Sequence, residues 1–354
     1  MRALLKWLGT ILLFLAVALC FAPTLVPLFL DRIYYSGPAS GHYDGERFFN
    51  PGAPPPRAVN PRRFASRWSG ERASWPEHVP VRPTVPPRRI AGDRMLVTWI
   101  GHATVLVQTQ SLNILTDPIW SERASPFSFA GLRRVRAPGV RFEDLPAIDL
   151  VLVSHNHYDH MDLATLRRLW ERDRPLIVTS LGNDSIIAGA GARAVARDWG
   201  GRVGVRRGID VIVERNHHWG SRWFTDRNRA LWSAFTVRTP AGNIFFAGDT
   251  GWGDGSWARE AARHGPYRLA IIPIGAYEPR DVMRNSHLDP EEAFRVFEAL
   301  DPVRALGVHW GTFQLTFEPI GDPPRRLAAL RSARRDARFI ATEVGRSFSV
   351  PEAR

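Results

Sequence analysis

The sequence predicts an α/β protein of the αββα type, in which two β-sheets pack face to face and helices cover their outer sides. Two observations predict this fold class. From Met95 onward, short apolar runs of β type are separated by turns, beginning with a hairpin. Further along, strand-like runs alternate with helical stretches, which is typical of sheets covered by helices. The composition, with 44% hydrophobic and 23% charged residues, is that of a globular protein.

The individual elements follow from the same patterns. We expect a hairpin of residues 95–109 and 112–116 that turns at Gln110-Ser111, followed by a buried strand at 148–154. Further strands are expected at 176–179, 211–213, 231–237, 244–247, 269–274 and 305–308, and helices at 163–173, 257–264, 290–300 and 324–337. The helix at 290–300 has a well-marked start, because Asp289 is a suitable N-cap and Pro290 fits the first helical position.

Residues 1–30 predict a single transmembrane helix that anchors the chain. No charged residue occurs from Trp7 to Leu30, and about 20 apolar residues are enough to span a bilayer as a helix. Arg2 and Lys6 precede this run and would hold the N-terminus in the cytoplasm, which places the catalytic domain outside it. A cleavable signal peptide is the alternative, although the residues around Cys20 match a cleavage site poorly.

Residues 31–94 are rich in Pro, Gly and Arg and show little periodicity. We therefore expect an irregular arm between the anchor and a catalytic domain at 95–350. Aromatic side chains in the arm indicate that parts of it pack on that domain; they are Phe48, Phe49, Trp68 and Trp75.

The charge balance favours anionic partners, and the cysteine content limits the kind of metal site. A formal net charge of +12 suits a phospholipid surface or nucleic acid, but arginine spread over a solvated face explains it equally well. Cys20 is the one cysteine, so the chain can build neither an internal disulfide framework nor a cysteine-based zinc site. A metal ion would have to be held by histidine and carboxylate side chains.

The most informative stretch is Ser154-His155-Asn156-His157-Tyr158-Asp159-His160, which follows the buried strand directly. His155 and His157 are two positions apart, so a turning backbone can direct both at one ion. Asp159 and His160 follow at once and can hold a second ion. Nitrogen and oxygen donors without sulfur suit zinc, and also manganese or iron. A histidine-rich surface loop is the alternative, but three of the 11 histidines within six positions make it improbable.

A site for two ions needs more donors than one loop supplies, and the other candidates also follow strand-like runs. His217-His218 comes after the run at 211–213, Asp249 closes the run at 244–247 after a glycine, and His309 follows 305–308. Each of these residues alone could be a packed or surface group. Together they indicate one metal site at the edge of the predicted sandwich.

The chain resembles a known family at these positions. The 154–160 stretch is similar to the H-x-H-x-D-H signature of metallo-β-lactamase-fold hydrolases. More specifically, residues 96–344 look like N-acylphosphatidylethanolamine-hydrolysing phospholipase D. The matching stretches are Thr98-Trp99-Ile100-Gly101-His102-Ala103-Thr104, Leu115-Thr116-Asp117-Pro118-Ile119, Phe245-Phe246-Ala247-Gly248-Asp249-Thr250-Gly251, Ile272-Pro273-Ile274-Gly275-Ala276-Tyr277-Glu278-Pro279-Arg280, His287-Leu288-Asp289-Pro290 and His309-Trp310-Gly311-Thr312-Phe313. The first 90 residues are not covered.

The resemblance implies two zinc ions and a role for each donor. His155, His157 and His218 would hold one zinc, while Asp159, His160 and His309 would hold the other, with Asp249 bridging both. His218 is preferred to His217 because the family ligand directly precedes a tryptophan. Asp159 and Asp249 would also orient the attacking hydroxide, and Asp117 would orient a metal-binding imidazole. His287 matches a family histidine near the substrate phosphate, although a residue that merely flanks a helix is an equally good interpretation.

The implied activity is hydrolysis of N-acylphosphatidylethanolamine to N-acylethanolamine and phosphatidate. The same centre in related branches cleaves lactones, thioesters or other phosphodiesters, so these substrates remain alternatives. A β-lactamase is disfavoured because there is no cysteine ligand and His160 occupies the second site. A lipid-binding protein without turnover is disfavoured because a structural zinc needs four ligands. We expect a phospholipid and the membrane as partners and no nucleic acid; a homodimer is compatible with the sequence.

Overall fold

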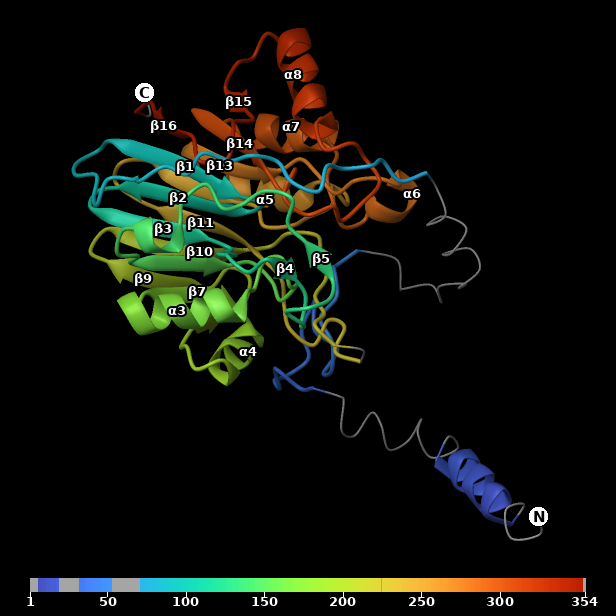
Figure 1. Ribbon diagram of the computed structural model, residues 1–354. Coiled ribbons are helices and arrows are strands. Elements are labelled where there is room, and N and C mark those ends of the chain that lie inside the picture. Colours follow the sequence, from blue (N-terminus) through green and yellow to red (C-terminus); the bar gives the residue numbers. More distant parts are fainter. Residues whose placement is uncertain (1–5, 19–31, 53–70, 224, 353–354) are drawn as a thin grey trace.

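The computed structural model describes residues 6–18, 32–52, 71–223 and 225–352, and it contains two seven-stranded sheets packed face to face (Figure 1). The first sheet has the order β16-β1-β2-β3-β6-β7-β8 and the second the order β15-β14-β13-β12-β11-β10-β9. The first sheet comprises β1 (Met95–Gly101), β2 (Thr104–Thr109), β3 (Leu112–Thr116), β6 (Leu150–Val153), β7 (Leu176–Ser180), β8 (Val195–Arg197) and β16 (Ser347–Val350). The second comprises β9 (Arg202–Arg206), β10 (Ile209–Glu214), β11 (Ala234–Arg238), β12 (Asn243–Phe246), β13 (Tyr267–Pro273), β14 (Arg304–Val308) and β15 (Phe339–Ile340). The predicted αββα sandwich is confirmed.

Helices cover the outer face of each sheet (Figure 1). On the first sheet these are α3 (Leu163–Asp173) and α4 (Asn183–Gly189), and on the second α5 (Ser256–Ala262), α7 (Pro290–Leu300) and α8 (Asp322–Arg334). The short helix α6 (Arg280–Met283), the 3-10 turn Phe142–Asp144 and a two-stranded ladder of β4 (Arg123–Ala124) and β5 (Leu132–Arg133) lie in the connections.

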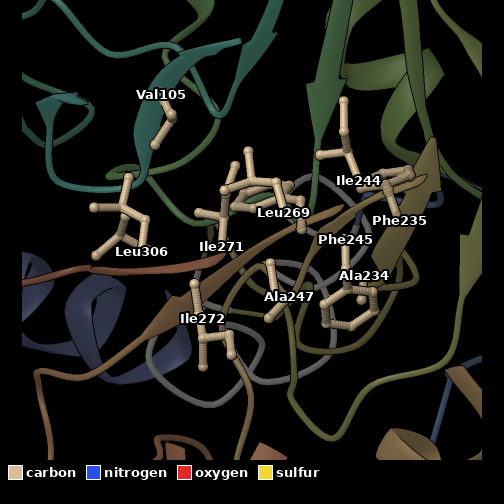
Figure 2. Close-up of a cluster of buried hydrophobic side chains, with 14 of the residues drawn as sticks. Val105, Ala234, Phe235, Ile244, Phe245, Ala247, Leu269, Ile271, Ile272 and Leu306 are labelled. Carbon is tan, nitrogen blue, oxygen red and sulfur yellow. The ribbon is translucent and has the colours of Figure 1, made fainter. Parts of the chain in front are cut away.

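Residue alternation along β6 explains how the layers are joined. Leu150 and Leu152 belong to the large core that includes the second sheet, whereas Val151 and Val153 belong to the smaller core under α3 and α4. Successive side chains of a strand point to opposite faces, so an entirely apolar strand must be covered on both sides. Figure 2 shows part of the large core, with Val105 of the first sheet near Leu306 of the second.

Strong local signals set the helix boundaries. The Asp162 side chain accepts a hydrogen bond from the backbone of Thr165 at the start of α3, and Asp289 forms a capping box with Glu292 at the start of α7. Both helices have the predicted bounds.

The predicted single strand at 95–109 is wrong: Gly101 and His102, with φ of +137° and +52°, reverse the chain between β1 and β2. The predicted turn at Gln110-Ser111 is confirmed.

The predicted membrane span is contradicted. Residues 6–18 are helical, but at about 1.5 Å per residue they reach roughly 20 Å, short of a hydrocarbon core of about 30 Å. Among the described residues, no helix combines the length and apolar composition needed to cross a bilayer. The predicted placement of the catalytic domain outside the cytoplasm rested on that span and falls with it. The rest of the predicted anchor, residues 1–5 and 19–31, lies outside the described residues.

The described parts of the predicted arm lie against the sandwich. Tyr43 and Phe48 are buried against Leu231 and Trp232 of the second half of the chain. Residues 71–94 run along the domain, where the backbone N–H of Val79 donates to the carbonyl of Val135. Trp75 is half-buried and Phe49 is exposed, while Trp68 lies outside the described residues. The domain boundaries at 30/31 and 94/95 stay predictions.

Candidate metal centre

The predicted donors follow strand ends that lie together. His155 comes after β6, His218 after β10, Asp249 after β12 and His309 after β14. In the second sheet β12 is parallel to β13 and β13 to β14, whereas β11 is antiparallel to both β10 and β12. The strands β10, β12 and β14 therefore run the same way, and their carboxyl ends share one edge. Loops at such an edge are the usual place for a site in sheets of this kind.

A glycine lets the two sheets approach at this edge. Gly248, at φ +59°, directly precedes Asp249, and a Cβ atom there would lie 2.6 Å from the Cβ of Ser154 and 3.0 Å from the carbonyl oxygen of Ser233. Any larger residue would collide with the strand end that precedes His155. The glycine thus brings the Asp249 carboxylate next to the histidine loop.

The first donor cluster consists of His155, His157, His218 and Asp249, whose donor atoms lie within 4.8 Å of one another. The Nδ1 atom of His157 is 2.8 Å from Nε2 of His155 and 3.4 Å from Nε2 of His218. These are the residues predicted for the first ion, together with the predicted bridge.

The second donor cluster consists of His102, Asp159, His160 and His309. The Nε2 atoms of His160 and His309 are 3.1 Å apart, and each lies 3.4 Å from Oδ2 of Asp159. Each also lies 3.1 Å from Oδ2 of Asp249. Since Asp249 also belongs to the first cluster, its carboxylate lies between the two, as predicted for a bridging ligand.

Hydrogen bonds from outside the clusters orient the imidazoles. Asp117 accepts a hydrogen bond of 2.6 Å from Nδ1 of His160, so the lone pair of His160 lies on Nε2, which faces the cluster. Ser154 holds Asp117 through both its backbone N–H and its hydroxyl group. Similarly, Nδ1 of His218 donates to the carbonyl of Ser286 at 2.8 Å. The predicted orienting role of Asp117 agrees with this geometry.

The donor spacing and chemistry fit divalent metal ions. In a tetrahedral zinc site with ligand bonds of about 2.0–2.1 Å, neighbouring ligand atoms are roughly 3.3 Å apart. Neighbouring donor atoms in the two clusters include pairs 2.8–3.9 Å apart, within an overall limit of 4.8 Å. Among the described residues, the buried Oδ1 of Asp249 has no hydrogen-bond partner, although a buried carboxylate oxygen normally has one. A bound ion would supply that interaction.

The electrostatics of the two clusters differ. Burial lowers the pKa of His157 to about 4, and it lowers the pKa of His155 and His218 well below the usual value, so these imidazoles are neutral at pH 7. Burial also acts to lower the pKa of His309, but Asp249 and Asp159 outweigh it and raise this pKa to about 9. The carboxylates therefore attract positive charge to the second cluster, whether a proton or a metal ion.

A family model described as the β-lactamase superfamily domain matches residues 112–310, a range that includes all seven predicted donors. The chain belongs to the metallo-β-lactamase superfamily. It is a metallo-hydrolase of this fold, and its histidine and aspartate clusters could bind metal ions.

Curated relatives place the chain within this superfamily. It is 36% identical over 265 residues to N-acyl-phosphatidylethanolamine-hydrolyzing phospholipase D 1 of Caenorhabditis elegans, covering 71% of this chain and 74% of the relative. It is 32% identical over 240 residues to the mitochondrial enzyme of the same name from Saccharomyces cerevisiae, covering 66% of this chain and 51% of that one. An isothiocyanate hydrolase from Delia radicum gut bacteria has the same fold, with a TM-score of 0.59 at 19% identity over 73% of this chain and the whole of that one.

One member of the second donor cluster, His102, is not among the donors predicted from the sequence. The buried His102 places its Nε2 atom 2.9 Å from Oδ2 of Asp159, and its ring lies 4.1 Å from that of His309 between centroids. Its backbone N–H donates to the hydroxyl of Thr312, and its carbonyl accepts from the N–H of His309. The matching stretch around Gly101-His102 contained the signal, but a single histidine between two strands gave no local reason to assign it.

The structure brings His218, and not His217, into the first donor cluster; the His217 ring lies against Gly253.

His287, predicted to act on the substrate, lies at the rim of both clusters. Its Nδ1 atom is 3.8 Å from Oδ2 of Asp249 and has no hydrogen-bond partner among the described residues. Burial lowers the pKa of His287 to about 4, so the ring is neutral and carries a single N–H donor.

Proposed function

We propose that this metallo-hydrolase holds two zinc ions and cleaves a phosphodiester bond in a phospholipid, with N-acylphosphatidylethanolamine as substrate. The observation that carries the proposal is the convergence of all seven predicted donors into two adjoining clusters. A single structural zinc needs four ligands and no open position, so seven donors favour a catalytic pair of ions. The phospholipid is favoured by the relatives named as phospholipases D, which share 36% and 32% identity with the chain.

The side chains of the clusters would divide the chemistry. Two zinc ions held there would supply hydroxide at neutral pH and neutralise charge on a phosphoryl oxygen. Asp159 and Asp249 would accept hydrogen bonds from the attacking water and direct its oxygen towards phosphorus. The bond that breaks joins phosphorus to the oxygen of the N-acylethanolamine. The water oxygen remains on phosphatidate, and a proton goes to the departing alcohol.

His287 is the proposed substrate-binding residue. It lies two residues before Asp289, the N-cap of α7. Because its imidazole is neutral and its Nδ1 faces Asp249 without a hydrogen bond, it can donate to a non-bridging phosphate oxygen next to the clusters. This interaction would hold the phosphate without adding a metal ligand.

Two exposed aromatic side chains in the connection between β4 and β5 suit a lipid substrate. Phe127 and Phe129, between β4 and β5, are 50% and 79% exposed, with ring centroids 5.5 Å apart. The chain just after β5 pairs with the loop that follows β14, through Arg134 and Phe313. Exposed aromatic side chains are costly in water unless they meet an apolar partner. We propose that they contact the acyl chains of the substrate.

The test is turnover of N-acylphosphatidylethanolamine in vesicles by the zinc-loaded protein in 18O-labelled water. We expect N-acylethanolamine and phosphatidate, with the label in phosphatidate because water attacks phosphorus. His287→Ala should slow cleavage by roughly 10–100-fold, because it removes a hydrogen bond to a charged group. The zinc content should not change. The exposed His78 provides the control, since His78→Ala should change neither. Efficient opening of lactones or thioesters without any phospholipid turnover would contradict the substrate proposal and leave the fold assignment intact.

A further inference from the structure

The described N-terminal segment, residues 32–52, packs on the loop that carries His218. This loop, residues 215–233, connects β10 to β11. The backbone N–H of Phe48 donates to the carbonyl of Asn228 at 2.8 Å, and the hydroxyl of Tyr34 donates to Asp226 at 2.8 Å. Phe48 is also buried in a small apolar cluster with Trp232. The 32–52 segment is therefore bound to the loop at several points along its length.

One of these contacts reaches a donor residue itself. The Nδ2 atom of Asn50 donates a hydrogen bond of 2.8 Å to the backbone carbonyl of His218, and Oδ1 of Asn50 accepts one of 3.2 Å from the indole of Trp232. The His218 side chain is fixed separately, through its Nδ1 atom and the carbonyl of Ser286. Asn50 therefore restrains the backbone of His218, while Ser286 restrains its ring.

The 215–233 loop also supports the histidine loop at 154–161. Arg222 donates to the carbonyls of Asn156 and Met161 at 2.9 and 2.8 Å, and the ring of Trp219 meets that of His157 edge-on at 4.3 Å between centroids. The contacts therefore form a continuous connection from the 32–52 segment, through the 215–233 loop, to two donors of the first cluster.

We propose that Asn50 is a positioning residue for the first donor cluster, and that the 32–52 segment forms part of the metal site although it lies outside the sandwich. With the Asn50 hydrogen bond in place, the backbone of His218 is held where its Nε2 atom faces His157 and Asp249. Without it, a buried carbonyl loses its partner and His218 gains freedom to move. The inference rests on the proposal that this cluster holds a metal ion, and not on the identity of the substrate.

The test compares two variants of the full chain by the rate at which zinc passes to a chelator. Asn50→Asp keeps the size of the side chain and the acceptor for Trp232 but removes the donor to His218. Partners that orient metal ligands typically change metal affinity by about 10–100-fold, so we expect one of the two ions to leave faster by that factor. The other ion should leave at the wild-type rate. With cobalt in place of zinc, the visible absorption of the faster-released ion should change.

The matched control is Tyr34→Phe, which removes one hydrogen bond between the same segment and the same loop without touching His218. It should release both ions at the wild-type rates, even where it lowers the melting temperature. Unchanged release from Asn50→Asp would overturn the inference, as would equal acceleration in both variants, because the segment would then act only on overall stability. A wild-type protein that retains both ions but ignores phospholipid would contradict the proposed substrate and leave this inference standing.

Discussion

In the first donor cluster His218 is supported from long loops, whereas the supports of the second cluster come from residues directly beside strand ends. His218 is held by Asn50, which lies 168 positions earlier in a segment outside both sheets. In the second cluster, His160 is held by Asp117, one residue after β3, and His309 is held by the backbone of His102, one residue after β1. Loops have fewer packed neighbours than strand ends, so they open at lower free energy. We therefore expect His218 to be the least rigidly held donor, and substitutions among its supports to weaken the first cluster more than the second.

The largest effect is expected from Asp249→Asn, because this carboxylate belongs to both clusters. The substitution removes the negative charge that lies 3.1 Å from both His160 and His309. We expect the affinity for both ions to fall by more than about 100-fold, beyond the usual effect of a residue that only orients a ligand. Metal content after dialysis, measured by mass spectrometry, checks this; Asp93→Asn, at an exposed position, is the control. Retention of one tightly bound ion would show that Asp249 serves a single cluster.

Asp117→Asn should have the next largest effect, greatest at the second cluster. The amide can no longer accept a charge-assisted hydrogen bond from Nδ1 of His160, so the ring loses its fixed tautomer. We expect one ion to be lost roughly 10–100-fold faster to a chelator, and the other to be affected less, since Asp117 reaches His155 only through the hydroxyl of Ser154. Faster loss of the ion that Asn50→Asp also releases would contradict the separation of the two clusters.

His102→Ala should have the smallest of the three effects and distinguishes between two roles of this residue. If His102 orients Asp159, its loss should accelerate release of the second ion by about 10-fold, the lower end for such partners, and His102→Gln should partly restore retention. Complete loss of the second ion in both variants would instead identify His102 as a ligand. Chelator competition at equal protein concentration measures both outcomes.

The parts of the fold that were predictable have local signals. The bounds of α3 and α7 could be predicted because Asp162 and Asp289 are N-caps followed by apolar periodicity. The edge strands β8 and β9 were missed, because they are short and their exposed arginines hide any apolar pattern. The division between β1 and β2 was missed because apolar side chains continue on both sides of the turn at His102.

The donors themselves were predictable for the same reason, since each follows an apolar strand and four of them lie within six positions. The residues that support the donors could not be predicted from the sequence. Asn50 acts on a residue 168 positions away, and His102 acts on Asp159 at a separation of 57 positions. No periodicity or spacing in one sequence reports such pairs, because folding alone brings them together.

The separation of the donors along the chain also determines when a metal ion can bind. His160 and His309 are 149 positions apart, and one follows a strand of the first sheet while the other follows a strand of the second. In an unfolded chain such donors are not held together, and a preformed metal site rarely exists there. We therefore expect a metal ion to bind once the two sheets have packed, and then to link them. Added zinc should consequently slow unfolding while leaving the folding rate unchanged. Its effect would be to lengthen the lifetime of the folded state.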